Sequence, residues 1–207
     1  MFYANIILNL LASASIAASG ASFDGTANVL YSYQNNIISN TKNIIPEVPF
    51  YSQFRDIDSK EWQKLGCGVT SLAMLINFYK PNSVTVNNLL KEGIADGAYL
   101  DGAGWKHSGL VLLAKKYNLK SEAFDFSNLT KEDAFIKLEK SLKEGPVIVS
   151  IHYKFDIKSS IPHLAVINGI DGNIVYYNDP AGKSAGEKIS VEDFIKVWKK
   201  RFITVRS

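Results

Sequence analysis

The stretch from Cys67 to Tyr79 constrains the fold of this chain more than any other. Read as a helix, it presents apolar side chains on every face, whereas a surface helix keeps one polar face. A helix of this kind is buried on several sides, so other elements must surround it. Of 207 residues, 46% are hydrophobic, which is enough for one sizeable core and leaves little for a second domain. The apolar positions are Val69, Leu72, Ala73, Met74, Leu75, Ile76 and Phe78.

Cys67, the single cysteine of the chain, lies between Gly66 and Gly68 at the start of this helix. Unpaired N–H groups and the positive end of the helix dipole favour thiolate over thiol at such a position. We expect the two glycines to permit a tight turn and to leave room for an approaching substrate. Cys67 is therefore a candidate nucleophile. Taken alone, the position fits a buried structural cysteine equally well.

His163 and Asp179 are the candidate partners of this thiol. His163 opens an apolar, β-branched stretch that ends before Asp171-Gly172-Asn173, which is a hairpin turn signal. A second strand, 174–177, leads to Asn178-Asp179-Pro180, where the proline ends the strand. Antiparallel pairing brings both side chains to the same end of the hairpin. There the carboxylate would accept the imidazole Nδ1–H, and His163 would act as general base.

The other two histidines have weaker surroundings. His107 falls in the first turn of a predicted helix, 105–117, without an acidic partner placed by a hairpin. His152 ends a predicted strand, 146–152, and no carboxylate follows it before Asp156. We therefore regard His152 as the reserve candidate for the base.

Gln53 is the candidate oxyanion donor. It ends an extended segment, Val48-Pro49-Phe50-Tyr51-Ser52, upstream of the cysteine. Thiolate attack on an acyl carbon creates an oxyanion, which a glutamine amide and the backbone N–H of the nucleophile can stabilise together. Glutamines are common on protein surfaces, so Gln53 alone would not indicate an oxyanion donor. It is a candidate because Gln, Cys, His and Asp follow one another in this order along the chain.

Together these residues resemble the C39-like cysteine peptidases, which have a papain-like fold. The resemblance spans approximately residues 46–205 and is carried by Gln53, Gly66-Cys67-Gly68, Pro162-His163 and Asn178-Asp179-Pro180-Ala181. It implies Cys67 as nucleophile, His163 as general base and acid, Asp179 as the residue that orients His163, and Gln53 as oxyanion donor. The best-known members are fused to an ABC transporter and remove double-glycine leader peptides. This sequence shows no nucleotide-binding region or multi-span membrane part, so it is more similar to the stand-alone members.

The order of predicted elements indicates an α+β fold with an antiparallel sheet, because helices come first and strands later. Further helices are expected at 86–95, from Thr130 to the Gly145-Pro146 pair, and from Ser190 onward. Further strands are expected at 163–170, 173–178 and 202–205.

Three segments are expected along the chain. Residues 1–21 are apolar with small residues toward the end and read as a possible signal peptide, although no Lys or Arg precedes the apolar run. Asn5 and Asn9 interrupt that run, so no stable membrane span is expected. Residues 22–45 read as a polar linker and 46–207 as the catalytic domain. We therefore predict export to the cell surface or medium, with a cytoplasmic location as the alternative.

Charge and composition limit the partners. A net charge of +3 is too small to indicate nucleic-acid binding, and no His or Cys cluster has metal-ligand spacing. We expect a peptide or protein substrate and no cofactor; the sequence does not indicate an oligomeric state.

Three functions are compatible with these residues. The first is peptide-bond cleavage through an acyl-enzyme on Cys67. The second is another acyl transfer with the same residues, as in an amidase, a deamidase or a transglutaminase-like enzyme. The third is a non-catalytic binding module, which the complete set of Gln, Cys, His and Asp disfavours.

Overall fold

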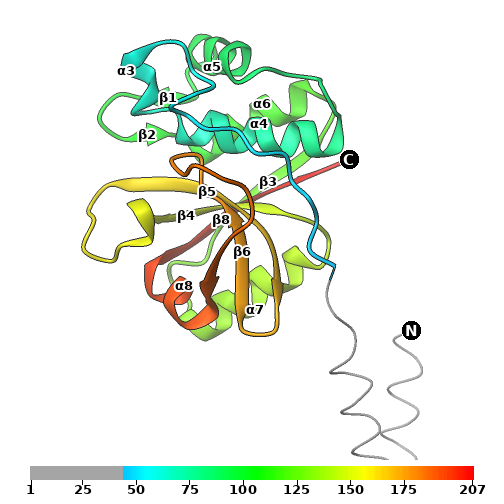
Figure 1. Ribbon diagram of the computed structural model, residues 1–207, viewed down its shortest axis with the longest axis vertical. Coiled ribbons are helices and arrows are strands. Elements are labelled where there is room, and N and C mark those ends of the chain that lie inside the picture. Colours follow the sequence, from blue (N-terminus) through cyan, green and yellow to red (C-terminus); the bar gives the residue numbers. More distant parts are fainter. Residues whose placement is uncertain (1–43) are drawn as a thin grey trace, which may run out of the picture. The chain divides into compact units, whose positions relative to one another are not determined.

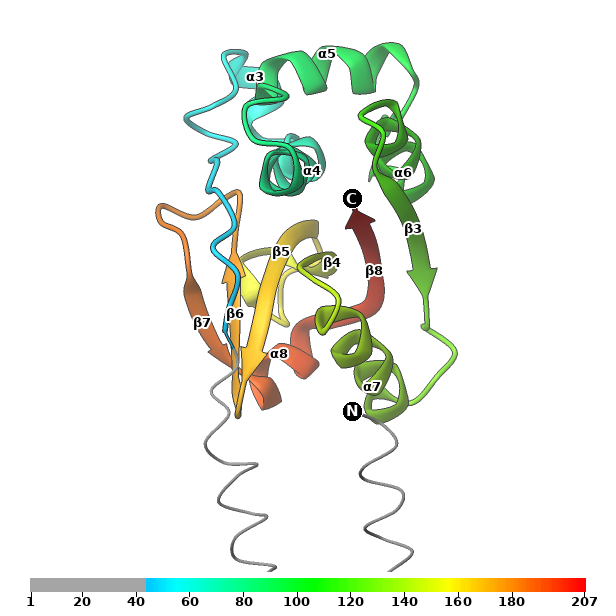
Figure 2. The same ribbon diagram turned by 90° about the vertical axis from the view of Figure 1, so that its right-hand side faces the viewer.

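The computed structural model describes residues 44–207. The apolar segment 1–21 and all of the linker except Ile44 and Ile45 lie outside the described residues. Within the described part, helices α3–α6 lie on one side of a sheet, and α7 and α8 lie on the other (Figures 1 and 2). The helices are α3 (Lys60–Gln63), α4 (Cys67–Tyr79), α5 (Val86–Ala95), α6 (His107–Lys116), α7 (Lys131–Leu142) and α8 (Val191–Val197).

The sheet has six strands in the order β3-β8-β4-β5-β6-β7, and every neighbouring pair is antiparallel. The two central strands are buried on both faces, because consecutive residues pack on opposite layers of helices. Ile148 faces the core under α4, whereas Val147 and Val149 face the core over α7. The strands are β3 (Lys120–Asp125), β4 (Val147–His152), β5 (Pro162–Asp171), β6 (Ile174–Asn178), β7 (Glu187–Ser190) and β8 (Trp198–Arg206).

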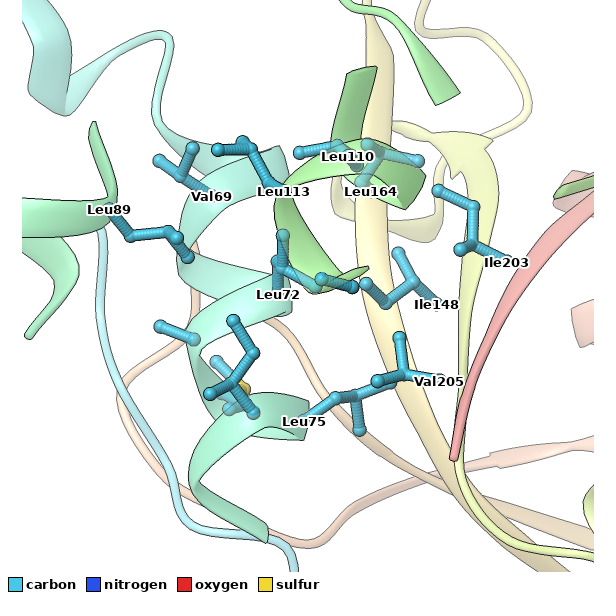
Figure 3. Close-up of a cluster of buried hydrophobic side chains, with 14 of the residues drawn as sticks. Val69, Leu72, Leu75, Leu89, Leu110, Leu113, Ile148, Leu164, Ile203 and Val205 are labelled. Carbon is cyan, nitrogen blue, oxygen red and sulfur yellow. The ribbon is translucent and has the colours of Figure 1, made fainter. Parts of the chain in front are cut away.

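Helix α4 is the centre of the larger core. Leu72 and Leu75 point toward Ile148 and Val205 of the sheet, as Figure 3 shows. On its other sides the helix is covered by α5 and α6. All residues of α4 from Gly68 to Asn77 are buried, as the all-round apolar pattern predicts. This packing fixes the N-terminus of α4, and therefore Cys67, relative to the sheet.

The α+β class and the hairpin of β5 and β6 are confirmed. The register pairs Asp171 with Ile174 across the predicted turn. The helices expected at 86–95, from Thr130 and from Ser190 are present as α5, α7 and α8. Each is capped by a hydroxyl, of Thr85, Thr130 or Ser190, which accepts from the backbone N–H three residues on.

Several elements differ from the sequence prediction. The helix expected at 105–117 begins at His107, because Trp105 pairs with Tyr99 in a short hairpin of β1 (Tyr99–Leu100) and β2 (Gly104–Trp105). The closing strand was placed at 202–205, yet β8 begins at Trp198, directly after α8. Strands β3 and β7 were not predicted. Both are edge strands, with mostly polar sequences that show no alternation.

Among residues 44–207, no helix is both long enough and apolar enough to cross a bilayer.

Candidate active site

Cys67 is the first residue of α4 and is half-buried. Its neighbouring glycines are in close packing contact with other side chains, a role that the sequence did not indicate. A Cβ on Gly68 would lie 2.5 Å from Cγ of Trp105, and one on Gly66 would lie 2.1 Å from Cδ1 of Ile57. Both distances are far below van der Waals contact, so only glycine lets the chain pack this closely around the thiol.

His163 and Asp179 form a buried pair at the end of the β5–β6 hairpin. Nε2–H of His163 donates to Oδ1 of Asp179 across 2.6 Å, and the two residues are 4% and 6% exposed. The expected partner atom was Nδ1, so the prediction had the right residues and the wrong ring nitrogen. The same carboxylate oxygen accepts from the backbone N–H of Ala181 at 2.8 Å, which holds it in place.

Cys67 acts on the same imidazole through a side-chain hydrogen bond and its negative charge. Because Nε2 is bound to Asp179, Nδ1 is the ring nitrogen left for the thiol. Burial alone would lower the pKa of His163. The hydrogen bonds with Asp179 and Cys67, together with the negative charges of both, outweigh burial and raise that pKa to about 9. The imidazole is therefore positioned between the thiol and the carboxylate, and its protonated form is favoured.

Gln53 is buried beside the same site. Its backbone N–H donates to the carbonyl of Pro180 at 2.8 Å, next to Asp179. A Cβ on Gly66 would be 3.6 Å from Cβ of Gln53, which puts Gln53 beside the start of α4. Its amide Nε2 donates one N–H to the carbonyl of Gln63 at 2.8 Å. One N–H of the amide therefore orients the side chain, and the amide has a second N–H to offer.

The two other histidines have different partners. Nδ1–H of His152 donates to the carbonyl of Ser159 at 2.6 Å and so ties down the loop between β4 and β5. His107 Nε2 lies 2.9 Å from Oγ of Ser150 on β4. Burial and the nearby Arg201 lower the pKa of His107, and Asp125 opposes them only in part. Neither imidazole takes the place beside Cys67 that His163 occupies.

Aromatic side chains surround the thiol, and sequence reasoning missed them. On the helical side, Tyr99 packs edge-on against Trp62 and Trp105, with centroid distances of 4.9 and 5.4 Å. On the sheet side, Tyr153 packs edge-on against His163 at 5.1 Å. Burial raises the pKa of both tyrosines, and the negative charge of Cys67 adds to the effect. The sequence does not predict the short Tyr99–Trp105 hairpin, because most of its residues are typical of loops.

This arrangement fits nucleophilic chemistry. A thiol at a helix start, an imidazole in contact with it, a carboxylate that fixes the imidazole and a nearby amide donor are the groups that acyl transfer needs. In the described part of the chain, no three His, Cys, Asp or Glu side chains are grouped closely enough to hold a metal ion.

Comparison with known proteins points in the same direction. The family model described as "Peptidase_C39 like family" matches residues 45–202. A putative C39-like peptidase from Bacillus anthracis has a similar structure, with a TM-score of 0.58 and 25% identity, over 81% of this chain and 98% of that one. A double glycine motif protease from an AMS/PCAT transporter, solved with the leader peptide, gives a TM-score of 0.54 and 24% identity over 78% and 92%. No curated protein matches this chain.

Proposed function

Because this chain belongs to the Peptidase C39 like family and is a cysteine peptidase, we propose that it cleaves peptide bonds through an acyl-enzyme on Cys67. His163 serves as general base and acid, Asp179 orients it, and Gln53 donates to the oxyanion. The substrate is a peptide or an extended protein segment. The leader peptide bound to the structurally similar transporter protease supports this choice of substrate class.

The acylation step follows from the contacts of His163. Its Nδ1 holds the proton that comes from the Cys67 thiol, and Sγ attacks the scissile carbonyl carbon, whose π electrons move to oxygen. When the tetrahedral species collapses, the C–N bond breaks and Nδ1–H gives its proton to the leaving amine. Throughout, Nε2–H stays on Asp179, which keeps the ring oriented and supports its positive charge.

Deacylation reverses these roles. His163 Nδ1 accepts a proton from water, which attacks the thioester carbon, and the C–S bond breaks to return the thiolate. In both steps the oxyanion receives hydrogen bonds from the free N–H of Gln53 and from a backbone N–H at the start of α4. The first N–H groups of a helix have no partner within the helix, so they are available for this role.

One observation carries the proposal: the buried imidazole of His163 is bonded through Nε2 to Asp179, and Cys67 acts on the same ring through a side-chain hydrogen bond and its negative charge. A structural histidine has no need of a thiol partner. A base that must deprotonate a thiol and then protonate an amine needs this contact.

The test is to incubate the protein with a mixed peptide library and to identify products by mass spectrometry. Discrete cleavage by the wild type, its loss in Cys67→Ser, and a trapped thioester on Cys67 at short times are expected. Thiol labelling by an acyl probe without any cleavage would contradict the peptidase reading. It would favour transfer to an acceptor other than water, or deamidation. A protein that neither labels nor cleaves would be a binding module.

We also propose export, on the basis of the apolar segment at residues 1–21. N-terminal sequencing of the mature protein from culture medium and from cells tests this. An intact Met1 found only in the cytoplasm would refute it.

A further inference from the structure

The side chain of Tyr153 packs on the catalytic imidazole, although nothing in the chemistry of acyl transfer requires a phenol there. Its ring lies perpendicular to that of His163, at 86°, with the centroids 5.1 Å apart. Tyr153 belongs to η1 (Tyr153–Phe155), the short turn that follows β4. It is half-buried, and burial together with the negative charges of Asp179 and Cys67 raises the pKa of its hydroxyl, so its side chain lies close to both partners of His163.

The backbone around Tyr153 is built to hold the ring in place. Lys154 and Phe155 have φ values of 58° and 53°, a left-handed conformation that costs free energy in residues with a Cβ. The turn keeps this shape because it is fastened at several points. The backbone N–H of Tyr153 donates to the carbonyl of Ile161, and the Phe155 ring lies 4.2 Å from that of Tyr177.

We propose that Tyr153 is a positioning residue for catalysis: its ring screens the His163–Asp179 hydrogen bond from water and fixes the plane of the imidazole. The inference rests on the proposed function, because it assigns Tyr153 to the same reaction. A ring that is held perpendicular to the imidazole limits its rotation, and both ring nitrogens then stay aimed at Cys67 and Asp179. Exclusion of water strengthens the hydrogen bonds and charge interactions of His163.

The charged groups around His163 determine which way its pKa should move. Cys67 faces the ring from α4 and Asp179 faces it from the end of β6. Lys154 lies on the outer side, with Nζ 5.6 Å from the centroid of Tyr153. The net effect of the surroundings raises the pKa of His163 above its ordinary value. Loss of the Tyr153 ring would let water reach His163 and weaken its interactions with Cys67 and Asp179. The pKa of His163 should therefore fall back toward the ordinary value of about 6.5.

The first experiment measures this pKa directly by NMR in the resting enzyme, without substrate. The chain has only three histidines, so their ring protons are readily assigned, and His107 and His152 serve as internal references. In Tyr153→Ala and Tyr153→Leu the His163 titration should move to lower pH, whereas Tyr153→Phe should leave it in place. An unchanged titration in both ring-deleting variants would overturn the proposal.

The second experiment measures kcat, KM and their pH dependence on a cleaved peptide. Tyr153→Ala should lower kcat by on the order of 10-fold to 10²-fold, the scale of misplaced catalytic groups. KM should change little, and Tyr153→Phe should restore most of kcat. Loss that appears mainly in KM would mean that Tyr153 contacts substrate instead, and this too would overturn the positioning role.

Tyr176 offers a matched control. It is also half-buried and also carries a lysine over its ring, with Lys188 Nζ at 5.2 Å, but it lies on β6 and pairs across to Lys188 of β7. Tyr176→Ala should leave the His163 titration and kcat unchanged. If the wild type cleaves no peptide, the proposed function fails. The NMR titration still decides whether the Tyr153 ring controls the imidazole.

Discussion

Oγ of Ser71 donates a hydrogen bond to the carbonyl oxygen of Leu164 across 3.2 Å, and both residues are buried. Ser71 lies one helical turn after Cys67, and Leu164 is the chain neighbour of His163. The bond therefore joins the helix that carries Cys67 to the strand that carries His163. It sets the position of one relative to the other.

Loss of this bond should reduce both stability and turnover. Ser71→Ala leaves a buried carbonyl without that donor, at a cost of about 1–3 kcal/mol in the free energy of unfolding. Urea denaturation measures the cost, and steady-state kinetics should show a lower kcat. Thr70→Val is the matched control, since the buried hydroxyl of Thr70 has no hydrogen-bond partner in the described part of the chain. It should be neutral or stabilising, and equal losses in the two variants would refute the role of Ser71.

The pH dependence of activity should follow His163. Because the pKa of His163 is raised to about 9, the imidazolium that supports the thiolate persists up to that pH. The same protonation stabilises the fold: this contribution is complete below the unfolded pKa of about 6.5 and is lost as the pH rises through about 9. We expect kcat/KM to decrease as the pH rises through the pKa of His163.

Asp179→Asn tests the cause of this alkaline limb. The limb should move to lower pH, because the carboxylate charge that raises the pKa of His163 is gone. The rate should drop by up to roughly 10⁴-fold, as for loss of the orienting aspartate in serine triads. His163→Ala should be more severe. An alkaline limb that stays in place in Asp179→Asn would show that another group controls it.

Substitutions of Gln53 should act on kcat more than on KM. Gln53→Ala removes one oxyanion donor, at an expected cost of roughly 10²–10³-fold in kcat. Gln53→Glu should be worse, because a carboxylate would repel both the oxyanion and the Gln63 carbonyl that now accepts from Nε2. Cys67 should remain open to alkylation in both variants. Gln63→Ala is the control, since it keeps that backbone carbonyl. Unchanged kcat in Gln53→Ala would leave the backbone at the start of α4 as the oxyanion donor.

Gly68→Ala should destabilise the protein through Trp105. The added methyl meets an indole that cannot swing aside freely, because its Nε1 donates to the carbonyl of Leu65 at 2.6 Å. Overpacking of this kind costs about 1–3 kcal/mol. A double-mutant cycle with Trp105→Leu provides the check by thermal denaturation. Gly68→Ala should cost clearly less in the Trp105→Leu background, and purely additive effects would contradict the packing argument.

Much of the fold was predictable because its central elements carry strong local signals. The all-round apolar pattern of α4 and the turn signal at Asp171-Gly172-Asn173 each specify one structure. Edge strand β3 could not be predicted, since Lys120–Asp125 is mostly polar and becomes a strand only by pairing with β8. Its structure depends on a partner some eighty residues away, which no local pattern reveals.

The residues of the site were predictable where the chemistry allows only certain residue types. The contacts that depend on side-chain packing were not predictable. Cys67 was chosen from its place at a helix start, and His163 and Asp179 from the predicted hairpin, and the structure brings these three together. The ring nitrogen that meets Asp179 depends on the exact rotation of the imidazole, and hence on neighbours such as Tyr153. The use of Gly68 likewise depends on where Trp105 lies. Such contacts join distant parts of the chain, so no residue spacing in the sequence indicates them.

The hydrogen bond from Nδ2 of Asn178 to the carbonyl of Val48 joins positions 130 apart in sequence. Gln53 and Pro180 meet in the same way through the backbone. Contacts of this range form late in folding, because a long loop must close before they contribute. During synthesis, then, Cys67 leaves the ribosome well before its base and the orienting carboxylate. A nascent chain would therefore hold Cys67 without His163 and Asp179 beside it until these later strands have been made.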